Sequence, residues 1–333
     1  MTAEHPFAQY VRIIGKGPNL SRPLSADEMF DAATMIMNGQ VEPLQLGAFL
    51  CILRMRTEVP EEGAGFVRAV RDTLQRPDDV PEVDLDWSSY SGKKRQLPWF
   101  LLATRLLAEN GVRIFMQGTE GHTPDRIYSR PALQSMGIPV AGSLNEAADH
   151  IRQSNFAFLP LAQLSPKLQE IIDLKSILGL RSPVNTFGRM VNPFGAAHEI
   201  QTVFHPNYRD VHRDTANMLG QKHMAVFKGE GGEVERRPQK PVLVQSLHNG
   251  VLSEEEWPAL LGEDSVRVDE DMNLDRLKTV WSGDEDDDYA TTAITGTAAI
   301  VLRLLNRANS PADATAQASK MWHQRDKSRI GNG

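Results

Sequence analysis

The stretch LRSPVNTFGRMVNPFG, residues 180–195, is the most distinctive part of the sequence and decides how the rest is interpreted. It lies in a chain of 333 residues that begins with a wholly helical pattern and continues with short β-like runs separated by helices. Several protein families share that outline, so the loops between elements must distinguish them. Arg181 and Arg189 in this stretch, with Lys167 and Lys175 before it, repeat a cation every six to eight residues.

Three helical patterns occupy most of residues 1–80. Ser25 and Glu28 form a capping box ahead of an apolar run at helical spacing. Pro43 opens LQLGAFLCILRMR, whose apolar residues surround nearly the whole helix and therefore predict a buried helix. Pro60 opens the third helix. The segment RPDDVPEVDLD, residues 76–86, is rich in proline and acid and predicts a linker.

The rest of the chain alternates between strand-like and helical patterns. Short β-like runs cover residues 112–116, 156–159, 202–204, 224–227 and 242–244. Helical patterns accompany them, notably at residues 98–110 and 291–306. Such alternation is typical of a central, mainly parallel sheet covered on both faces. The expected fold class is therefore α/β, with a small all-helical domain ahead of a larger α/β domain.

The net charge of −7 is unevenly spread along the chain. Residues 253–288 contain fourteen acidic residues against Arg267, Arg276 and Lys278, a balance of −11, whereas residues 87–240 carry +6. Such asymmetry suits an anionic partner, although solvated faces also differ in charge by chance. The acidic run 284–288 precedes an expected helix, whose N-terminus it would stabilise. A second interpretation is that this run screens the basic region.

The composition excludes several classes of protein. A single cysteine, Cys51, cannot form an internal disulfide or a cysteine-rich zinc site. His198, His205 and His212 recur at intervals of seven, but Pro206 interrupts any helix that would align them, so no metal site is expected. No apolar run is long enough to span a bilayer, and the N-terminal segment lacks the apolar core of a secretion signal. We therefore expect a cytoplasmic protein without a membrane partner.

The stretch 180–195 resembles the Arg-Thr-x-x-Asn-x-x-Gly-Pro-x-x-Asn-Pro segment of anthranilate phosphoribosyltransferases, members of glycosyl transferase family 3, and more loosely that of the related nucleoside phosphorylases. The matching positions are Arg181, Ser182, Asn185, Gly188, Asn192 and Pro193. Segments 13–17, 38–39 and 46–54 also resemble the helical domain of that family.

This resemblance implies a small helical domain hinged to a larger α/β domain, with the substrate in the cleft between them. Residues 1–78 would form the helical domain, with helices from about 163–185 packing on it. Residues 79–162 and 186–333 would form the α/β domain. The resemblance also implies a homodimer made through the N-terminal helices.

Two of the family's phosphate-binding motifs are altered in this chain. Its glycine-rich loop Gly-Thr-Gly-Gly-Asp corresponds to WSSYSGKKRQ at residues 87–96, where Gly92 alone lets backbone amides approach a phosphate. Its Lys-His-Gly-Asn-Arg segment corresponds to MQGTE at residues 116–120. This segment contains an acidic residue and lacks both of the family's cations, which disfavours the binding of a diphosphate.

Two further motifs are altered as well. The Asp-Glu pair that binds magnesium in the family is reduced to Gly232 and Glu233, and one carboxylate holds magnesium poorly. The arginine that faces the aromatic acceptor corresponds to Lys175, which lacks the planar, two-pronged geometry of a guanidinium. Anthranilate phosphoribosyltransferase activity is therefore expected to be absent.

These departures resemble a divergent, YbiB-like branch of the family, whose members are associated with sequence-independent DNA and RNA binding by homodimers. The resemblance thus implies a nucleic-acid-binding homodimer with no catalytic residue, metal or cofactor. Nucleic acid would contact Lys93, Lys94, Arg95, Lys167, Lys175, Arg181 and Arg189. The ancestral substrate pocket would contain Ser91, Gly92, Gln117, Gly118, Thr119, Asn185 and Glu233.

The residues themselves support nucleic-acid binding only in part. Lys93, Lys94 and Arg95 lie on an expected strand-to-helix turn, where the helix N-terminus adds to their attraction for phosphate. A second possible function is a phosphoribosyl or related glycosyl transferase, a pentosyltransferase, with a non-standard substrate and magnesium as cofactor. A third is a protein-interaction scaffold with neither activity.

Overall fold

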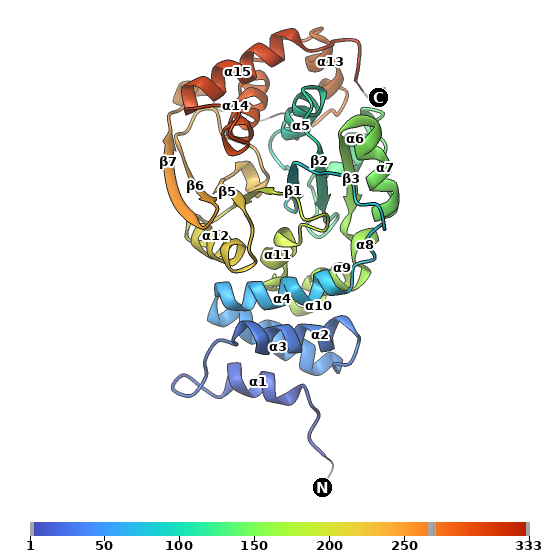
Figure 1. Ribbon diagram of the computed structural model, residues 1–333, viewed down its shortest axis with the longest axis vertical. Helices are drawn as coiled ribbons and strands as arrows, with labels where there is room; N and C mark the ends of the chain where they lie inside the picture. Colours follow the sequence, from blue (N-terminus) through green and yellow to red (C-terminus); the bar gives the residue numbers. More distant parts are fainter. Residues whose placement is uncertain (1–2, 266–268, 270, 331–333) are drawn as a thin grey trace.

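The computed structural model describes residues 3–265, 269 and 271–330, so that Arg267 and Glu270 of the acidic window lie outside the described residues. Four helices form a small domain at one end of the molecule (Figure 1). They are α1 (Ala8–Gly15), α2 (Ala26–Met37), α3 (Pro43–Arg56) and α4 (Pro60–Asp72). The predicted capping box at Ser25 and Glu28 is confirmed, and it starts α2.

Packing within this domain follows from two sequence features. Helices α2 and α4 lie close together because Gly65 of α4 has no side chain, and a β-carbon there would lie 2.2 Å from the Ala26 carbonyl oxygen. Helix α3 differs from the expectation of burial on all sides, since Leu44 is 88% exposed and Met55 79%. That prediction is wrong because one face of α3 lies at the surface of the chain.

Seven strands in the described part of the chain form one sheet, in the order β3-β2-β1-β4-β5-β6-β7. They are β1 (Leu85–Ser89), β2 (Ile114–Gly118), β3 (Phe156–Pro160), β4 (His198–Val203), β5 (His223–Lys228), β6 (Val242–His248) and β7 (Val251–Trp257). Strands β1 to β5 pair in parallel, and β6 and β7 add an antiparallel hairpin at one edge. The predicted α/β class with a mainly parallel sheet is confirmed.

Two strands differ from the sequence-based expectation. Strand β1 begins inside the segment that was expected to be a linker, because residues 85–86 enter the sheet and are buried. Strand β7 lies in the acidic window, where Glu254 and Glu256 are exposed at the edge of the sheet. The five predicted β-like runs correspond to β2 to β6.

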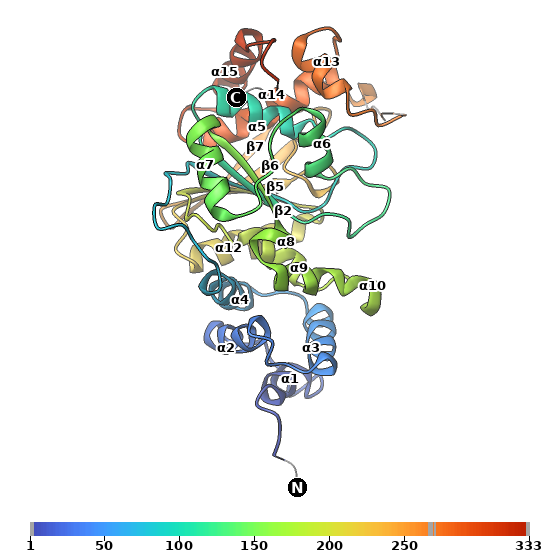
Figure 2. The same ribbon diagram turned by 90° about the vertical axis from the view of Figure 1, so that its right-hand side faces the viewer.

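Helices cover both faces of the sheet (Figures 1 and 2). One face packs against α5 (Phe100–Glu109) and α14 (Asp288–Leu304), with α15 (Pro311–Gln324) lying on α14. The other face packs against α7 (Leu144–Ser154), α8 (Leu161–Leu164) and α12 (Arg209–Met218). The connections contain α6 (Ser129–Ser135), α9 (Pro166–Asp173), α10 (Lys175–Leu178), α11 (Val184–Phe187), α13 (Arg276–Ser282) and the 3-10 turns η1 (Gly188–Met190), η2 (Pro206–Tyr208), η3 (Glu230–Gly232) and η4 (Glu263–Ser265).

Short helices from the middle of the chain pack against the helical domain. Phe66 of α4 contacts Phe187 of α11, with ring centroids 5.4 Å apart. Buried apolar residues of α1 to α4 and of α8, α9 and α11 belong to one continuous cluster. This arrangement agrees with the helices from about residue 163–185 that were expected to pack there, whereas the domain limits themselves stay a prediction.

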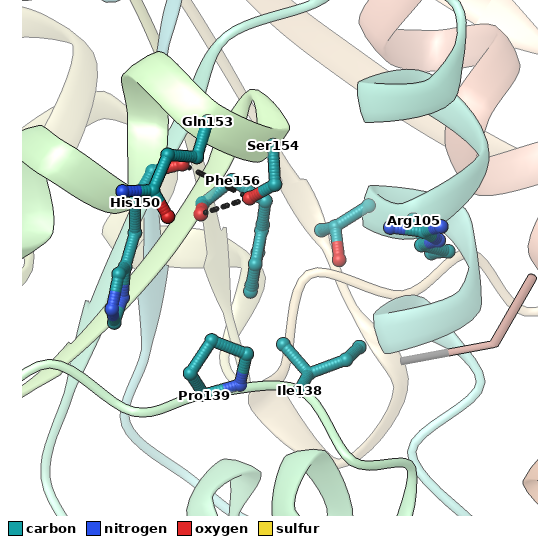
Figure 3. Close-up of a pocket in the computed structure, with 8 residues that line it drawn as sticks. Arg105, Ile138, Pro139, His150, Gln153, Ser154 and Phe156 are labelled. Atoms are coloured by element: carbon teal, nitrogen blue, oxygen red, sulfur yellow. Dashed lines mark hydrogen bonds between the residues drawn. The ribbon is translucent and has the colours of Figure 1, made fainter. Parts of the chain in front are cut away.

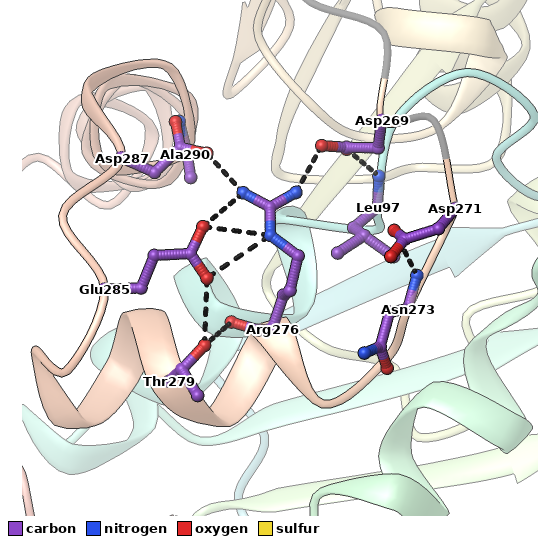
Figure 4. A network of polar contacts seen from close by, with 9 residues as sticks. All are labelled: Leu97, Asp269, Asp271, Asn273, Arg276, Thr279, Glu285, Asp287 and Ala290. Atoms are coloured by element: carbon purple, nitrogen blue, oxygen red, sulfur yellow. Dashed lines mark hydrogen bonds and ion pairs between the residues drawn. The ribbon is translucent and has the colours of Figure 1, made fainter.

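The acidic window has a structural role (Figure 4). Arg276 Nη1 lies 2.5 Å from Asp269 Oδ1. Its Nη2 lies 2.6 Å from Glu285 Oε1 and 2.8 Å from Asp287 Oδ2. Asp287 also accepts a hydrogen bond from Ala290 N and so caps α14. The helix-starting role that the sequence predicts for the acidic run is therefore present at Asp287.

Two further observations limit where a function can lie. A cavity between α5 and α7, lined by Arg105, His150 and Phe156 among others, has a volume of only about 50 Å³ (Figure 3). That space holds roughly one or two water molecules and is too small for a substrate. No helix among the described residues is long and apolar enough to cross a lipid bilayer.

Candidate functional site

The candidate site lies at the carboxyl ends of β1 and β4, where the sheet meets the helical domain. The chain passes from β1 to β2 and β3 on one side, and β4 then pairs with the other side of β1, so the strand order reverses between β1 and β4. In open α/β sheets, ligands bind at such a reversal point. Two loops meet here, residues 90–97 after β1 and residues 229–235 after β5.

The loop after β1 forms a small anion-binding arrangement that a carboxylate already fills. Ser91 N and Gly92 N both donate to Glu233 Oε1, over 2.5 and 2.6 Å. Glu233 is fully buried, and its other carboxylate oxygen makes no hydrogen bond to these amides. Burial raises the pKa of Glu233, while Arg189 and the two amides oppose that rise.

Glycines allow the second loop to deliver Glu233 to these amides. Gly231 and Gly232 have φ values of 65° and 88°, in the left-handed region that favours glycine. A β-carbon on Gly232 would also lie 2.7 Å from Ser91 Oγ. The two glycines before Glu233 therefore allow this turn.

Arg189, from the 180–195 stretch, holds the two loops together. Its Nη2 donates to Ser91 Oγ over 2.9 Å, and its guanidinium lies 5.3 Å from the centre of the Tyr90 ring. Tyr90 Oη in turn lies 2.5 Å from Gln117 Oε1 and 2.8 Å from the Gly188 carbonyl oxygen. Tyr90 and Gln117 are therefore buried structural groups beneath the site.

A cavity of about 200 Å³ lies between the helical and α/β domains, beside Ser91. Three guanidinium groups line it, those of Arg54, Arg181 and Arg189. The remaining lining residues are Ser91, Ser182, Asn185, Thr186, Thr202, Val203, Phe204, His205, Tyr208 and His212. The lining thus contains cations, hydroxyls and amides but no carboxylate, which is the chemistry of a site for an anion. One of these cations, Arg54, also donates through Nη1 to Oε1 of Glu58, a residue outside the lining, over 3.2 Å.

Lys175 and Arg181 converge on one side chain. Lys175 Nζ and Arg181 Nη2 both donate to Thr123 Oγ1, over 3.3 and 3.0 Å. Burial lowers the pKa of Arg181, and the neighbouring Arg126 lowers it further. Burial and Arg181 lower the pKa of His122 to about 4. Neighbouring cations therefore add to burial in lowering the pKa values of Arg181, Lys175 and His122.

The Lys93–Arg95 run is not three solvent-facing cations. Lys93 is 1% exposed, and its Nζ lies 2.5 Å from Glu235 Oε1, so the expectation that it faces phosphate is wrong. Lys94 and Arg95, in contrast, are exposed. They line a second hollow of about 330 Å³ together with Arg126, Arg237 and Glu230, and the last two pair with each other at 2.7 Å.

The structure disperses some other predicted site residues. Lys167 lies on α9 and pairs with Glu170 at 2.9 Å on the surface of that helix. Gly118, at the end of β2, lies so close to β1 that a β-carbon would be 1.8 Å from the Ser89 carbonyl oxygen. Thr119 donates to Gln169, and Asn185 lines the cavity of the three arginines.

Magnesium does not fit this site. The single remaining carboxylate, Glu233, faces two backbone amides that donate to it, and Gly232 offers no side-chain oxygen. Across the described ranges, no three His, Cys, Asp or Glu side chains are placed to hold a metal ion. A hard cation needs several oxygen ligands, so this arrangement suits an anion rather than a metal.

Sequence reasoning missed Arg54 and Arg126. Arg54 reaches the site from α3, where its Nη1 donates to Tyr208 Oη over 3.0 Å. Arg126 Nη1 donates to the Ser91 and Gly92 carbonyl oxygens over 2.9 and 3.1 Å. The match of segment 46–54 to the family's helical domain was a signal for Arg54, whereas no sequence signal marked Arg126.

Two family models match this chain, and known proteins agree with them. The helical bundle domain of the glycosyl transferase family matches residues 8–74, and its a/b domain matches residues 101–324. YbiB of Escherichia coli is 26% identical over 239 residues, which are 70% of this chain and 74% of YbiB. The anthranilate phosphoribosyltransferase of Brevibacillus brevis is 27% identical over 276 residues, 80% of this chain and 79% of that enzyme.

Among solved structures, the anthranilate phosphoribosyltransferase of Thermus thermophilus has a TM-score of 0.79 and 19% identity, covering 96% of this chain and 94% of that one. The same order of a helical domain and an α/β domain is therefore found at the level of sequence models, relatives and fold. The chain belongs to the glycosyl transferase family, as a member that resembles anthranilate phosphoribosyltransferase.

Proposed function

We propose that this protein is a pentosyltransferase-like protein whose interdomain cleft binds a phosphorylated pentose that carries no diphosphate. The observation that supports this most strongly is the convergence of Arg54, Arg181 and Arg189 on one cavity without a carboxylate. Arginine binds phosphate oxygens through two parallel hydrogen bonds, and Asn185 and Thr202 offer partners for sugar hydroxyls.

A diphosphate substrate is disfavoured by the same geometry. The amides of Ser91 and Gly92 are already occupied by Glu233, and magnesium does not fit the site. A transferase that moves a phosphoribosyl group from a diphosphate needs both features to hold the charge of the leaving group. The substrate would therefore be bound without magnesium and would differ from that of anthranilate phosphoribosyltransferase.

Isothermal titration with ribose 5-phosphate, in the presence of EDTA, tests this proposal. We expect binding by the wild-type protein that weakens by roughly ten-fold in Arg181→Ala, the loss that one charge-assisted hydrogen bond produces. Lys167→Ala is the matched control, since it removes a cation that lies on α9 and does not line the cavity. Equal affinity in all three proteins, or no binding by the wild type, would contradict the proposal.

Sequence-independent nucleic-acid binding is a second candidate function. It is favoured by the exposed Lys94 and Arg95, which line one hollow with Arg126 and Arg237. A polyanion held there would release counterions, so its affinity would fall steeply with salt. The absence of a third exposed cation at Lys93 weakens this candidate relative to the cleft.

The same titration separates the two candidates when random-sequence DNA and RNA oligonucleotides are added as competitors across a salt series. The nucleic-acid function predicts affinity at low salt that is lost in the double variant Lys94→Ala/Arg95→Ala and retained in Lys167→Ala. Oligonucleotide affinity that does not change in the double variant counts against this candidate. Displacement of ribose 5-phosphate by the oligonucleotide would mean that the hollow and the cleft form one binding surface.

A further inference from the structure

The Ser91–Gly92 turn has the structure of an anion site. Two consecutive backbone N–H groups point at a single oxygen atom, and Gly92 has a φ of 64°, the left-handed conformation that closes such a nest of amides. Arg189 donates to Ser91 Oγ beside it and interacts electrostatically with Glu233. Backbone amides and a guanidinium together are the groups that proteins use to hold phosphate oxygens.

The carboxylate that fills this nest of amides uses only one of its two oxygen atoms to accept hydrogen bonds from them. Glu233 accepts from both amides with Oε1 alone, so its second carboxylate oxygen makes no hydrogen bond to the nest. The Ser89 side chain, at the end of β1, also interacts with the Glu233 carboxylate. A phosphate has more acceptor oxygens than a carboxylate and would use both amides and Arg189.

The nest borders the cleft through residues that belong to both. Ser91, Arg189 and Thr202 line the 200 Å³ cavity. Ser91 Oγ and Thr202 Oγ1 each donate to the Gly232 carbonyl oxygen, over 3.1 and 3.0 Å, and so fix the residue that precedes Glu233. An anion in the cavity therefore lies next to the nest but is kept out of it by one side chain.

We propose that Glu233 is a built-in anion that closes a phosphate site, and that removing its carboxylate opens the Ser91 and Gly92 amides to inorganic phosphate or pyrophosphate. The side chain acts as a specificity-determining residue, because it occupies the groups that a second phosphate would need. This inference goes beyond the proposed function and holds whether or not the cleft takes a sugar phosphate.

Titration of Glu233→Ala, Glu233→Gln and the wild type with pyrophosphate, in the presence of EDTA, tests the inference. We expect Glu233→Ala to bind pyrophosphate roughly ten-fold or more tightly than the wild type, since at least one charge-assisted hydrogen bond is gained. Glu233→Gln should fall between them, because its amide oxygen still competes for the amides but no longer repels the anion. Amide proton and nitrogen resonances of Ser91 and Gly92 should shift with pyrophosphate in the variants only.

Glu256→Ala is the matched control, because it removes the same charge from the exposed face of the edge strand β7. Tighter binding by Glu256→Ala to the same degree would overturn the inference, since net charge alone would explain it. So would a folded Ala or Gln variant that gains no affinity, or a wild-type protein whose Ser91 and Gly92 resonances already respond. If Glu233→Ala does not fold, the Gln variant carries the test. The probe and the variants differ from those of the ribose 5-phosphate titration, so either proposal can fail while the other stands.

Discussion

Two carboxyl groups lie side by side beneath the site, Asp86 on β1 and Glu199 on β4, which are direct partners in the parallel pairing of these strands. Both are fully buried. Burial and the neighbouring Glu199 raise the pKa of Asp86 far above its ordinary value, and burial raises the pKa of Glu199 to about 7. Arg71 of α4 partly opposes the rise of both pKa values, and its Nη2 lies 3.7 Å from Glu199 Oε1. Because one guanidinium balances the charge of only one of the two buried carboxyls, the pair favours keeping one proton at neutral pH.

We expect Asp86→Asn to raise the free energy of unfolding at pH 8 by roughly 1–2 kcal/mol, because the folded wild type must keep a proton on a buried carboxyl that the unfolded chain releases, whereas asparagine is uncharged in both states. The sign follows from linkage. The folded protein keeps a proton on Asp86 that the unfolded chain releases above about pH 4, so this residue makes the wild type less stable as the pH rises through that range toward the folded pKa. Urea unfolding of both proteins between pH 5 and 8 measures the difference, which should shrink toward low pH.

Asp84→Asn, two residues away, is the control, and its expected effect on the free energy of unfolding has the opposite sign. Burial opposes the charge of Asp84, but hydrogen bonds from Arg113 outweigh that effect and lower the pKa of Asp84. Its stabilising contribution is present above the unfolded pKa and is lost as the pH falls. The Asp84 variant should therefore be less stable than the wild type at pH 8. An Asp86 variant that is also less stable at pH 8 would show that the buried pair is not under strain.

Single residues of the site were predictable mainly where the resemblance supplied a motif. Gly92, Glu233 and Arg181 were found in this way, whereas Arg189 was found from the spacing of cations, and the structure brings these residues together. The burial of Lys93 was not predictable, because its partner Glu235 is 142 positions away in the sequence. A run of cations carries no signal about which side chain turns inward.

At the scale of elements, periodic apolar patterns predicted the parallel strands β2 to β5, which are largely buried. Strand β1 was hidden because residues 85–89 read LDWSS, where the buried positions include Asp86 and two serines. Strand β7 was hidden for the opposite reason, since charged side chains are tolerated on an exposed edge strand and protect it against pairing with other chains. Strands that break the apolar pattern can be recognised only from their partners.

Close contact between two helices can also outweigh the intrinsic helix propensity of a residue. Gly65→Ala should destabilise the protein by roughly 1–3 kcal/mol, although alanine is the better helix former. The reason is that a β-carbon at Gly65 would lie 2.2 Å from the Ala26 carbonyl oxygen and 2.9 Å from Met29 Cβ, so α2 and α4 would be forced apart. Thermal unfolding of the variant measures the effect.

Gly47→Ala in α3 is the matched control, since its β-carbon would meet only Leu178 Cδ2, at an ordinary 3.6 Å. This change should leave stability unaltered or raise it by up to about 1 kcal/mol. If both variants behave alike, close packing at Gly65 does not set the approach of α2 to α4.

At the scale of the molecule, the cleft depends on how the two domains are joined. Arg71 of α4 donates to the Val191 and Met190 carbonyl oxygens, over 2.7 and 3.2 Å, next to Arg189 in the sequence. Arg54 of α3 reaches Tyr208 on the other side of the cleft. Both residues belong to helices whose amphipathic patterns were predictable, but their contacts across the domain boundary were not, because they join segments more than a hundred residues apart.

The helical domain presents an apolar seam on its outer side. Leu44, Ala48, Cys51 and Met55 follow one another at i, i+4, i+7 and i+11 along α3, and all four are exposed or half-buried. Leu44 and Met55 are among the most exposed large apolar residues of the described chain. Rows of exposed apolar residues are typical of surfaces that contact other proteins, and the homodimer through these helices, which the resemblance to the family implies, stays a prediction.

We expect a homodimer that the double variant Leu44→Glu/Met55→Glu weakens by roughly two to three orders of magnitude, since two carboxylates would have to be buried in an apolar contact. Sedimentation velocity across a concentration series measures this, with circular dichroism to show that the helices persist. Val251→Glu is the control, because Val251 is 67% exposed but lies on the β6–β7 hairpin, away from the helical domain (Figure 1). A wild-type protein that sediments as a monomer, or equal loss of association in the Val251 variant, would show that the seam on α3 is not where two copies meet.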